Sequence, residues 1–136
     1  MDFLGYRKLN VYQQAREIVK QVYALIKNFP KEEQFALSAQ LRRAAVSITS
    51  NIAEGTSRYS YKDKVHFLEM SFGSLMEVMS QLEIAEDLGY ITMEQQHNME
   101  IHVVQVAQML TNLQYSFMPK DDKGTASKPF QQKVNN

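Results

Sequence analysis

The sequence predicts an all-α protein, folded as an antiparallel up-down-up-down four-helix bundle. Three observations support this fold class. Apolar residues recur at alternating steps of three and four in four successive stretches, the spacing of helices with one buried face. Short connections separate these stretches, so each helix is expected to run antiparallel to the one before it. No stretch shows the alternating pattern of a strand that would compete with the helices.

The first two helices are predicted from the apolar stripes before and after Pro30, which cannot continue a helix. The first stripe consists of Tyr12, Ala15, Val19, Val22, Ile26 and Phe29. The second helix is expected to begin near Glu32 and Glu33, since carboxylates are favourable at a helix N-terminus. Its stripe, which leads toward Gly55, consists of Leu37, Leu41, Ala45, Ile48 and Ile52.

The third and fourth helices have recognisable start and stop signals. Ser60 with Asp63 resembles a capping box at the start of the third helix, and Gly89 is a plausible left-handed stop. Thr92 with Gln95 is a capping-box candidate for the fourth. The third stripe consists of Val65, Leu68, Phe72, Leu75, Met79 and Leu82. The fourth consists of Met99, Val103, Val106, Leu110, Leu113 and Phe117.

Length and composition suit one domain. The chain has 136 residues, of which 44% are hydrophobic, enough to fill a single core. We expect the bundle to span residues 1–118 and residues 119–136 to form a flexible polar tail without a fifth helix. The absence of cysteine excludes a disulfide framework. No apolar run suits a signal peptide or a membrane span, so a cytoplasmic location and no membrane partner are expected.

The segment 40–55 has two chemically distinct faces. At 100° per residue, the core stripe of the second helix lies opposite a polar face that consists of Arg43, Ser47, Ser50 and Glu54. The polar face is expected to meet something outside the subunit. This segment closely resembles the signature sequence of the four-helix-bundle protein family of 23S rRNA intervening sequences. The matching residues are Leu-Arg-Arg-Ala-Ala-Val-Ser-Ile-Thr-Ser-Asn-Ile-Ala-Glu-Gly. This family is related to the accessory variability protein of diversity-generating retroelements.

The resemblance extends over roughly residues 3–118. It includes Phe29-Pro30-Lys31-Glu32-Glu33, Gly73-Ser74-Leu75, Gln81-Leu82-Glu83-Ile84-Ala85 and Leu88-Gly89-Tyr90-Ile91. The resemblance implies the four-helix fold and a homopentameric assembly. The residues alone do not predict the number of subunits.

Charge is unevenly distributed although the net charge is zero. Residues 1–64 contain eleven Lys or Arg and six Asp or Glu, whereas residues 65–119 contain seven acidic residues and no Lys or Arg. A polyanion such as structured RNA would therefore dock on the first two helices. The candidate nucleic-acid contacts are Arg16, Lys20, Arg42, Arg43, Arg58 and Lys62, with Tyr59 and Tyr61 beside the last two as possible stacking partners.

Two other interpretations of these basic residues stay open. They can form a solvated surface paired with the acidic half, or steer subunits into register during assembly. Arg43 suits either an acid across an interface or, on an open surface, a phosphate.

Apolar residues outside the core stripes favour self-association, because contiguous exposed apolar patches are usually covered by a partner. These are Ile18, Leu25, Phe67, Met70, Met76, Val78 and Ile84. The alternative is a wide core face with scattered exposed residues. The candidate oligomer interface consists of Ser47, Ser50, Asn51, Glu54, Phe67 and Met70.

No catalytic residue, metal site or cofactor is expected. Glu94 with His97 and Asp63 with His66 have a spacing found in metal-binding bundles, but antiparallel helices place these pairs at opposite ends. No histidine is close in sequence to Ser47, and the glycines are isolated. The sequence therefore predicts a non-enzymatic, oligomeric bundle that binds structured RNA or a nucleoprotein partner. The alternative is a protein-protein interaction scaffold without nucleic-acid binding.

Overall fold

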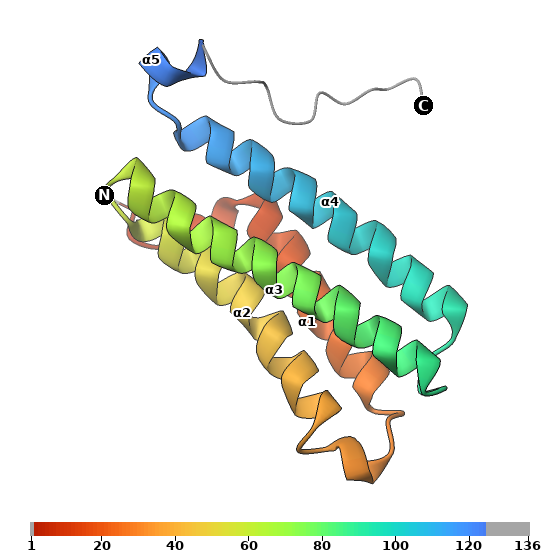
Figure 1. Cartoon of the computed structure of the whole chain (residues 1–136). Coiled ribbons are helices and arrows are strands. Elements are labelled where there is room, and N and C mark those ends of the chain that lie inside the picture. Colours follow the sequence, from red (N-terminus) through yellow and green to blue (C-terminus); the bar gives the residue numbers. More distant parts are fainter. Residues whose placement is uncertain (1, 125–136) are drawn as a thin grey trace.

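Four long helices follow one another antiparallel along the chain and form a bundle in the computed structural model, which describes residues 2–124 (Figure 1). Their bounds are α1 Asn10–Ile26, α2 Leu37–Ser57, α3 Tyr61–Asp87 and α4 Met93–Phe117. Short 3-10 helices precede α1 and α2, namely η1 Gly5–Lys8 and η2 Lys31–Glu33. No strand occurs within residues 2–124. The predicted fold class is confirmed.

The predicted signals at the ends of α3 and α4 are confirmed. Ser60 Oγ accepts a hydrogen bond from the Asp63 backbone N–H at 3.1 Å. Thr92 and Gln95 form a reciprocal capping box, with distances of 3.1 Å and 2.9 Å. Gly89 has φ +79°, the left-handed region in which a Cβ is unfavourable. These contacts fix where the third helix stops and where the fourth begins.

The core lies between the four helices and agrees best with the sequence on α2. Leu41, Ala45, Ile48 and Ile52 are all completely buried, as their stripe predicts. Across the bundle the largest fully buried side chains are Ile18, Leu41, Ile48, Ile52, Leu68, Leu75, Leu82, Leu110, Val22, Val78, Val103 and Val106. Three residues of the polar face of α2, Arg43, Ser50 and Glu54, are exposed as a result.

The buried faces of α1 and α3 differ from their predicted stripes. Ile18, predicted to be outside the core, is completely buried, whereas Val19 is only half-buried. The same two errors occur on α3, where Val78, predicted outside the core, is completely buried and the stripe residue Phe72 is 40% exposed. The buried face of α3 is directed toward both α2 and α4, and it is rotated relative to the predicted stripe. Met76 and Ile84 lie on the surface, as predicted.

Two predicted helix boundaries need correction. Glu32 and Glu33 lie in η2, and α2 begins later, at Leu37. Glu33 nevertheless caps the helix, because its Oε1 accepts a hydrogen bond from the Leu37 N–H at 3.3 Å. Beyond Pro119, residues Lys120–Lys123 form one further helical turn, α5, where no helix was expected. The rest of the predicted tail, residues 125–136, lies outside the described residues.

Candidate nucleic-acid and oligomer interface

An open groove runs over the outer side of α2, between α1 and α3. It brings together six of the twelve predicted site residues, which are Arg42, Arg43, Ser47, Ser50, Asn51 and Met70. The groove also contains residues that were not predicted as part of a site, which are Tyr23, Phe35, Ala39 and Val46. It therefore combines two arginines with exposed apolar side chains on one face.

The two arginines of this groove have different surroundings. Arg42 is half-buried, and its Nη2 donates a hydrogen bond to the backbone oxygen of Gln34 at 3.0 Å. Arg43 is exposed and forms no hydrogen bond or ion pair with any residue in 2–124. A guanidinium without an internal partner can donate a pair of hydrogen bonds to an oxyanion, either a phosphate or a carboxylate. Arg43 is the most available anion contact of the groove.

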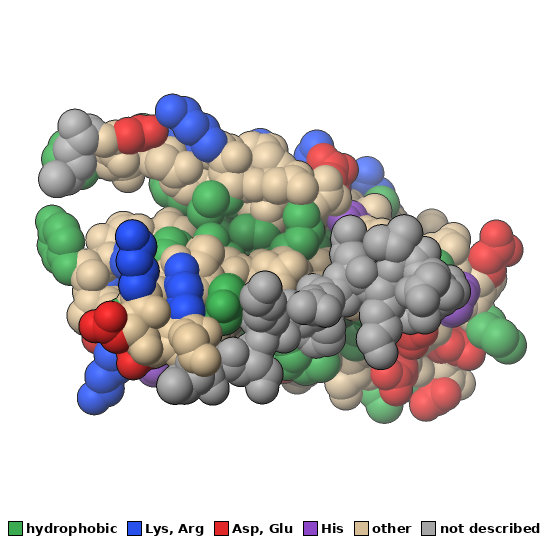
Figure 2. Space-filling view, turned by 90° about the horizontal axis from the view of Figure 1, so that it is seen from above, with side chains coloured by type: hydrophobic (Ala, Val, Ile, Leu, Met, Phe, Trp, Pro, Cys, Tyr) green, Lys and Arg blue, Asp and Glu red, His purple; other side chains and the backbone are tan. Residues whose placement is uncertain are grey.

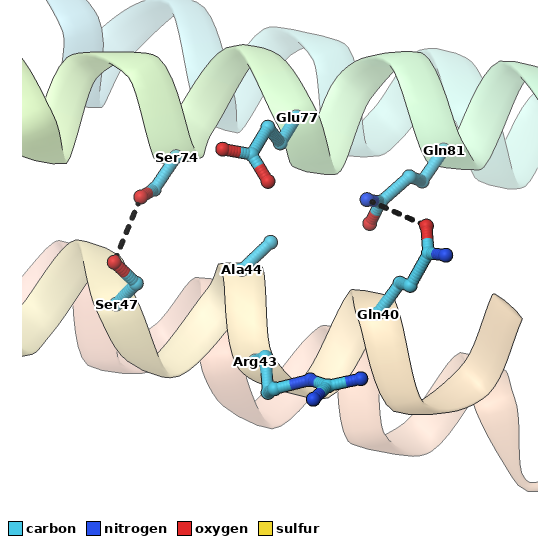
Figure 3. Close-up of a pocket in the computed structure, with 7 residues that line it drawn as sticks. All are labelled: Gln40, Arg43, Ala44, Ser47, Ser74, Glu77 and Gln81. Carbon is cyan, nitrogen blue, oxygen red and sulfur yellow. Dashed lines mark hydrogen bonds between the residues drawn. The ribbon is translucent and has the colours of Figure 1, made fainter. Parts of the chain in front are cut away.

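Ser47 does not face away from the subunit, contrary to its predicted position. It is half-buried against α3, where the Ser74 hydroxyl donates a hydrogen bond to Ser47 Oγ at 2.9 Å (Figure 3). Asn51 Nδ2 donates to the same Oγ, also at 2.9 Å. Ser47 and Ser74 are small side chains that meet directly across the contact between α2 and α3. Ser47 therefore holds the helix pair together and is no free interface residue.

A second, polar groove lies between α2 and α3, and Arg43 borders it as well. Figure 3 shows Glu77 directed from α3 toward Ala44 of α2. Gln81 Nε2 donates to Gln40 Oε1 at 3.5 Å, and Gln81 Oε1 is buried without a hydrogen-bond partner. Arg43 and Glu77 form no ion pair with each other. The groove thus has an acidic and a basic group that both stay available to a partner.

Glu54, Arg58 and Phe67 form a separate cluster near the C-terminal end of α2. Arg58 Nη2 lies 3.0 Å from Glu54 Oε1, and its guanidinium carbon lies 4.6 Å from the centre of the Phe67 ring. Gly55 makes this cluster possible, because a Cβ there would come within 3.0 Å of Phe67 Cβ. These predicted site residues are engaged within the subunit, about 20 Å along the helix from Arg43.

The basic residues of α1 are partly neutralised. Lys20 Nζ lies 2.9 Å from Glu17 Oε1, and this hydrogen bond, with the lysine charge, lowers the pKa of Glu17. Arg16 lies with its guanidinium carbon 5.9 Å from the centre of the Tyr12 ring. Lys62, at the start of α3, is exposed. The predicted basic residues thus lie on α1, on α2 and at the start of α3, but they do not form a single site.

The uneven distribution of charge along the sequence produces an uneven distribution of charge on the surface of the bundle. Each of α1 and α2 contains a single acidic residue, Glu17 and Glu54 respectively. Many acidic side chains of α3 and α4 gather near the turn that joins these helices (Figure 2). An anionic ligand would be repelled there and attracted to α1 and α2.

The histidine pairs do not assemble a metal site. Within residues 2–124 no group of three His, Cys, Asp or Glu side chains is arranged to hold a metal ion. His97 Nδ1 lies 3.8 Å from Glu100, whereas His102 contacts Gln14 and Gln21 of α1. None of the helices in this range has both the length and the apolar character needed to cross a membrane.

The sequence reasoning missed the apolar rim of the α2 groove. Phe35 is 87% exposed in the connection between α1 and α2, and Val46 is also exposed. Tyr23, which is not part of the first apolar stripe, is also exposed and lines the groove. The available signal was that Phe35 and Val46 fit none of the four apolar stripes. Apolar residues that belong to no stripe therefore indicate an exposed apolar surface.

Comparison with known proteins agrees with this architecture. Residues 7–112 match the family described as 23S rRNA-intervening sequence protein. Among solved structures, the chain is similar to a protein of unknown function from the S23 ribosomal protein family of Bacteroides thetaiotaomicron. The TM-score is 0.69 at 24% sequence identity, and the match covers 76% of this chain and 96% of that one. No curated protein matches the sequence. With four helices in the expected order and the family match over most of its length, the chain belongs to the 23S rRNA-intervening sequence protein family.

Proposed function

We propose that this protein is a non-enzymatic, self-associating bundle that binds structured RNA, alone or within a nucleoprotein, through the basic face of α1 and α2. The observation that carries the proposal is Arg43, an exposed guanidinium without an internal partner, beside Arg42 in an open groove. Phosphate contacts from such side chains supply most of the sequence-independent affinity for nucleic acid. The family name, which refers to 23S rRNA, agrees with an RNA partner.

The charge distribution supports one orientation of the RNA. Lys20 has an internal acidic partner, so Arg42 and Arg43 supply most of the available positive charge in the middle of this face. The acidic residues of α3 and α4 disfavour contact with the opposite half. The RNA would lie across α1 and α2, with Arg16 as a further contact and with Arg58 and Lys62 at the far end.

Self-association is supported by exposed apolar side chains beside the arginines. Val46 and Met70 border the α2 groove, while Phe72 and Met76 are exposed farther around α3. Interfaces are enriched in aromatic residues, Met and Arg, which is the composition of this surface. The homopentamer implied by the family resemblance is part of this proposal, as is a cytoplasmic location. Ser50 and Asn51 would lie within the interface, whereas Glu54 and Phe67 would lie at its edge.

A second candidate function is a protein-protein scaffold without nucleic acid. Tyr23 and Phe35 favour it, because exposed aromatic rings beside an arginine are typical anchors for a protein partner. In this case Arg43 would pair with a carboxylate of the partner. The two functions differ in how binding responds to salt and to RNA.

The test measures affinity for a structured RNA hairpin over a range of salt concentrations. For the wild type we expect log affinity to fall linearly with log salt. The double variant Arg42→Glu, Arg43→Glu should bind more weakly and with a shallower slope. Lys31→Glu with Lys120→Glu makes the same charge change away from the groove and is the matched control. Absence of binding at low salt, or equal losses in both variants, would refute an RNA site in this groove.

A further inference from the structure

A pocket of about 370 Å³ lies at the end of the bundle where the N-terminal segment, the α2–α3 connection and the end of α4 meet. This volume is within the range of small-ligand pockets, about 300–1,000 Å³. Its aromatic and basic lining residues come from four separate parts of the chain. They are Phe3, Tyr6, Arg58, Tyr59, Lys64 and Phe117.

Two aromatic rings of this pocket have most of their surface uncovered. Phe3 is 80% exposed and Tyr59 is 92% exposed. They belong to segments that are more than fifty residues apart in sequence, yet they line the same pocket. Exposed aromatic faces bind unpaired nucleobases by stacking, because every base has a π-face and no sequence-specific hydrogen bond is needed.

Lys64 supplies a positive charge that no acidic residue within 2–124 neutralises. Its Nζ donates a hydrogen bond to the Thr56 backbone oxygen at 3.2 Å and lies 4.7 Å from the centre of the Phe117 ring. Both contacts orient the ammonium group without cancelling its charge. The group is therefore held at the pocket and remains able to attract a phosphate.

The other charged residues of the pocket have partners of opposite sign. Asp2 Oδ2 lies 3.4 Å from Lys8 Nζ, and Arg58 lies 3.0 Å from Glu54. Each of these pairs is neutral, so Lys64 supplies the positive charge of the pocket that has no acidic partner within residues 2–124. A ligand with an aromatic ring and a negative charge fits this combination better than a neutral or a cationic one.

We infer that this pocket binds an unpaired nucleotide of RNA, with the base against Tyr59 or Phe3 and the phosphate near Lys64. The inference rests on the proposed RNA function and adds a preference for RNA that has a single-stranded segment. The α2 groove, about 20 Å away along the helix, would contact the structured part of the same RNA. The two sites use different residues and can be removed separately.

The experiment measures fluorescence anisotropy of a labelled oligouridylate of about eight nucleotides, a length in the range of single-strand binding sites. We expect Tyr59→Ala to weaken binding by at least about fivefold, the effect of losing one stacked base. Met93→Ala is the control, because Met93 is a large, exposed apolar side chain at the start of α4, the opposite end of the bundle from the pocket. Lys64→Gln should weaken binding and reduce the salt dependence.

The outcomes separate this inference from the proposed function. If the oligouridylate does not bind, or if Tyr59→Ala and Met93→Ala have equal effects, the nucleotide pocket is wrong. Binding of the structured hairpin through Arg42 and Arg43 would then still support the proposed function. Since Tyr59 is on the surface, thermal unfolding of the variant should match the wild type and exclude misfolding as the cause of a loss.

Discussion

The Ser71 hydroxyl donates a 2.8 Å hydrogen bond to the backbone oxygen of Ile48, within the completely buried contact between α3 and α2. A serine in the middle of a helix usually bonds to a carbonyl of its own preceding turn. Here the bond crosses to the neighbouring helix. It fixes the axial position of α3 relative to α2, which apolar packing specifies less sharply.

Replacing Ser71 should therefore destabilise the bundle. We expect Ser71→Ala to lower the free energy of unfolding by about 0.5–1.5 kcal/mol relative to Ser80→Ala, because the first variant loses a buried hydrogen bond. Ser80 is exposed on the same helix and corrects for the higher helix propensity of alanine. Urea unfolding monitored by circular dichroism measures both. Equal stabilities would mean that the hydrogen bond contributes nothing.

Two glycines should respond oppositely to the same substitution. A Cβ on Gly55 would lie 3.2 Å from the Lys64 backbone oxygen, which cannot move as a flexible side chain can. A Cβ on Gly73 would meet nothing within 4 Å. We expect Gly55→Ala to be less stable than Gly73→Ala by about 1–3 kcal/mol, since overpacking opposes the same gain in helix propensity. Thermal melts of both variants test this ordering.

The stability of the bundle should decrease in mildly acidic solution because of His102. Its Nε2 lies 3.0 Å from Gln14 Oε1, and burial between α4 and α1 lowers its pKa below the ordinary 6.5, although Glu17 acts in the opposite direction. Below pH 6.5 the unfolded chain therefore binds the proton more readily than the folded one, and the free energy of unfolding falls as pH decreases.

The His102→Gln variant should remove this contribution. The stability difference between wild type and variant is expected to change as pH falls through 6.5 and to stay constant above it. Chemical unfolding at several pH values gives this difference. A difference that does not vary with pH would contradict the assigned pKa shift.

Self-association through exposed apolar residues at the α3 edge of the α2 groove predicts a sensitivity at Met70. This side chain is exposed beside Arg43 and Ser50, so Met70→Lys should place an unpaired charge in the proposed interface. We expect a smaller sedimentation coefficient than for the wild type. Met93→Lys is the control, because Met93 is exposed at the start of α4, at the end of the bundle. Identical particle sizes in all three proteins would place the interface elsewhere.

The sequence was sufficient to predict where the four long helices lie in the chain. It was not sufficient to predict which faces of α1 and α3 are buried. Local signals determine a helix end, so Ser60, Gly89 and Thr92 could be recognised from their own neighbours. Ile18 and Phe72 were misplaced because burial depends on which helices lie alongside, and this arrangement is not encoded in one stripe. Each long helix packs against two others, and the rotation of α1 and α3 between their neighbours decides which side chains are buried.

The candidate site was predictable in its charge and only partly in its geometry. Arg42 and Arg43 line one groove of α2, in the part of the chain before residue 65 where basic residues are in excess. Internal partners could not be read from the sequence. Ser47 bonds to Ser74 across 27 positions, and Arg58 is held by Glu54 and Phe67.

The close contact of α2 and α3 has a consequence for how the bundle opens. Gly55, the hydrogen bond from Ser71 and the Ser47–Ser74 pair lock these two helices along much of their shared length. The corresponding cross-links between α1 and α4 are made by His102 with glutamines at the surface. Amide protons in the middle of α2 and α3 should therefore exchange with solvent most slowly, while α1 and α4 detach together in partial openings. The segment with the family signature would then belong to the last part of the protein to unfold.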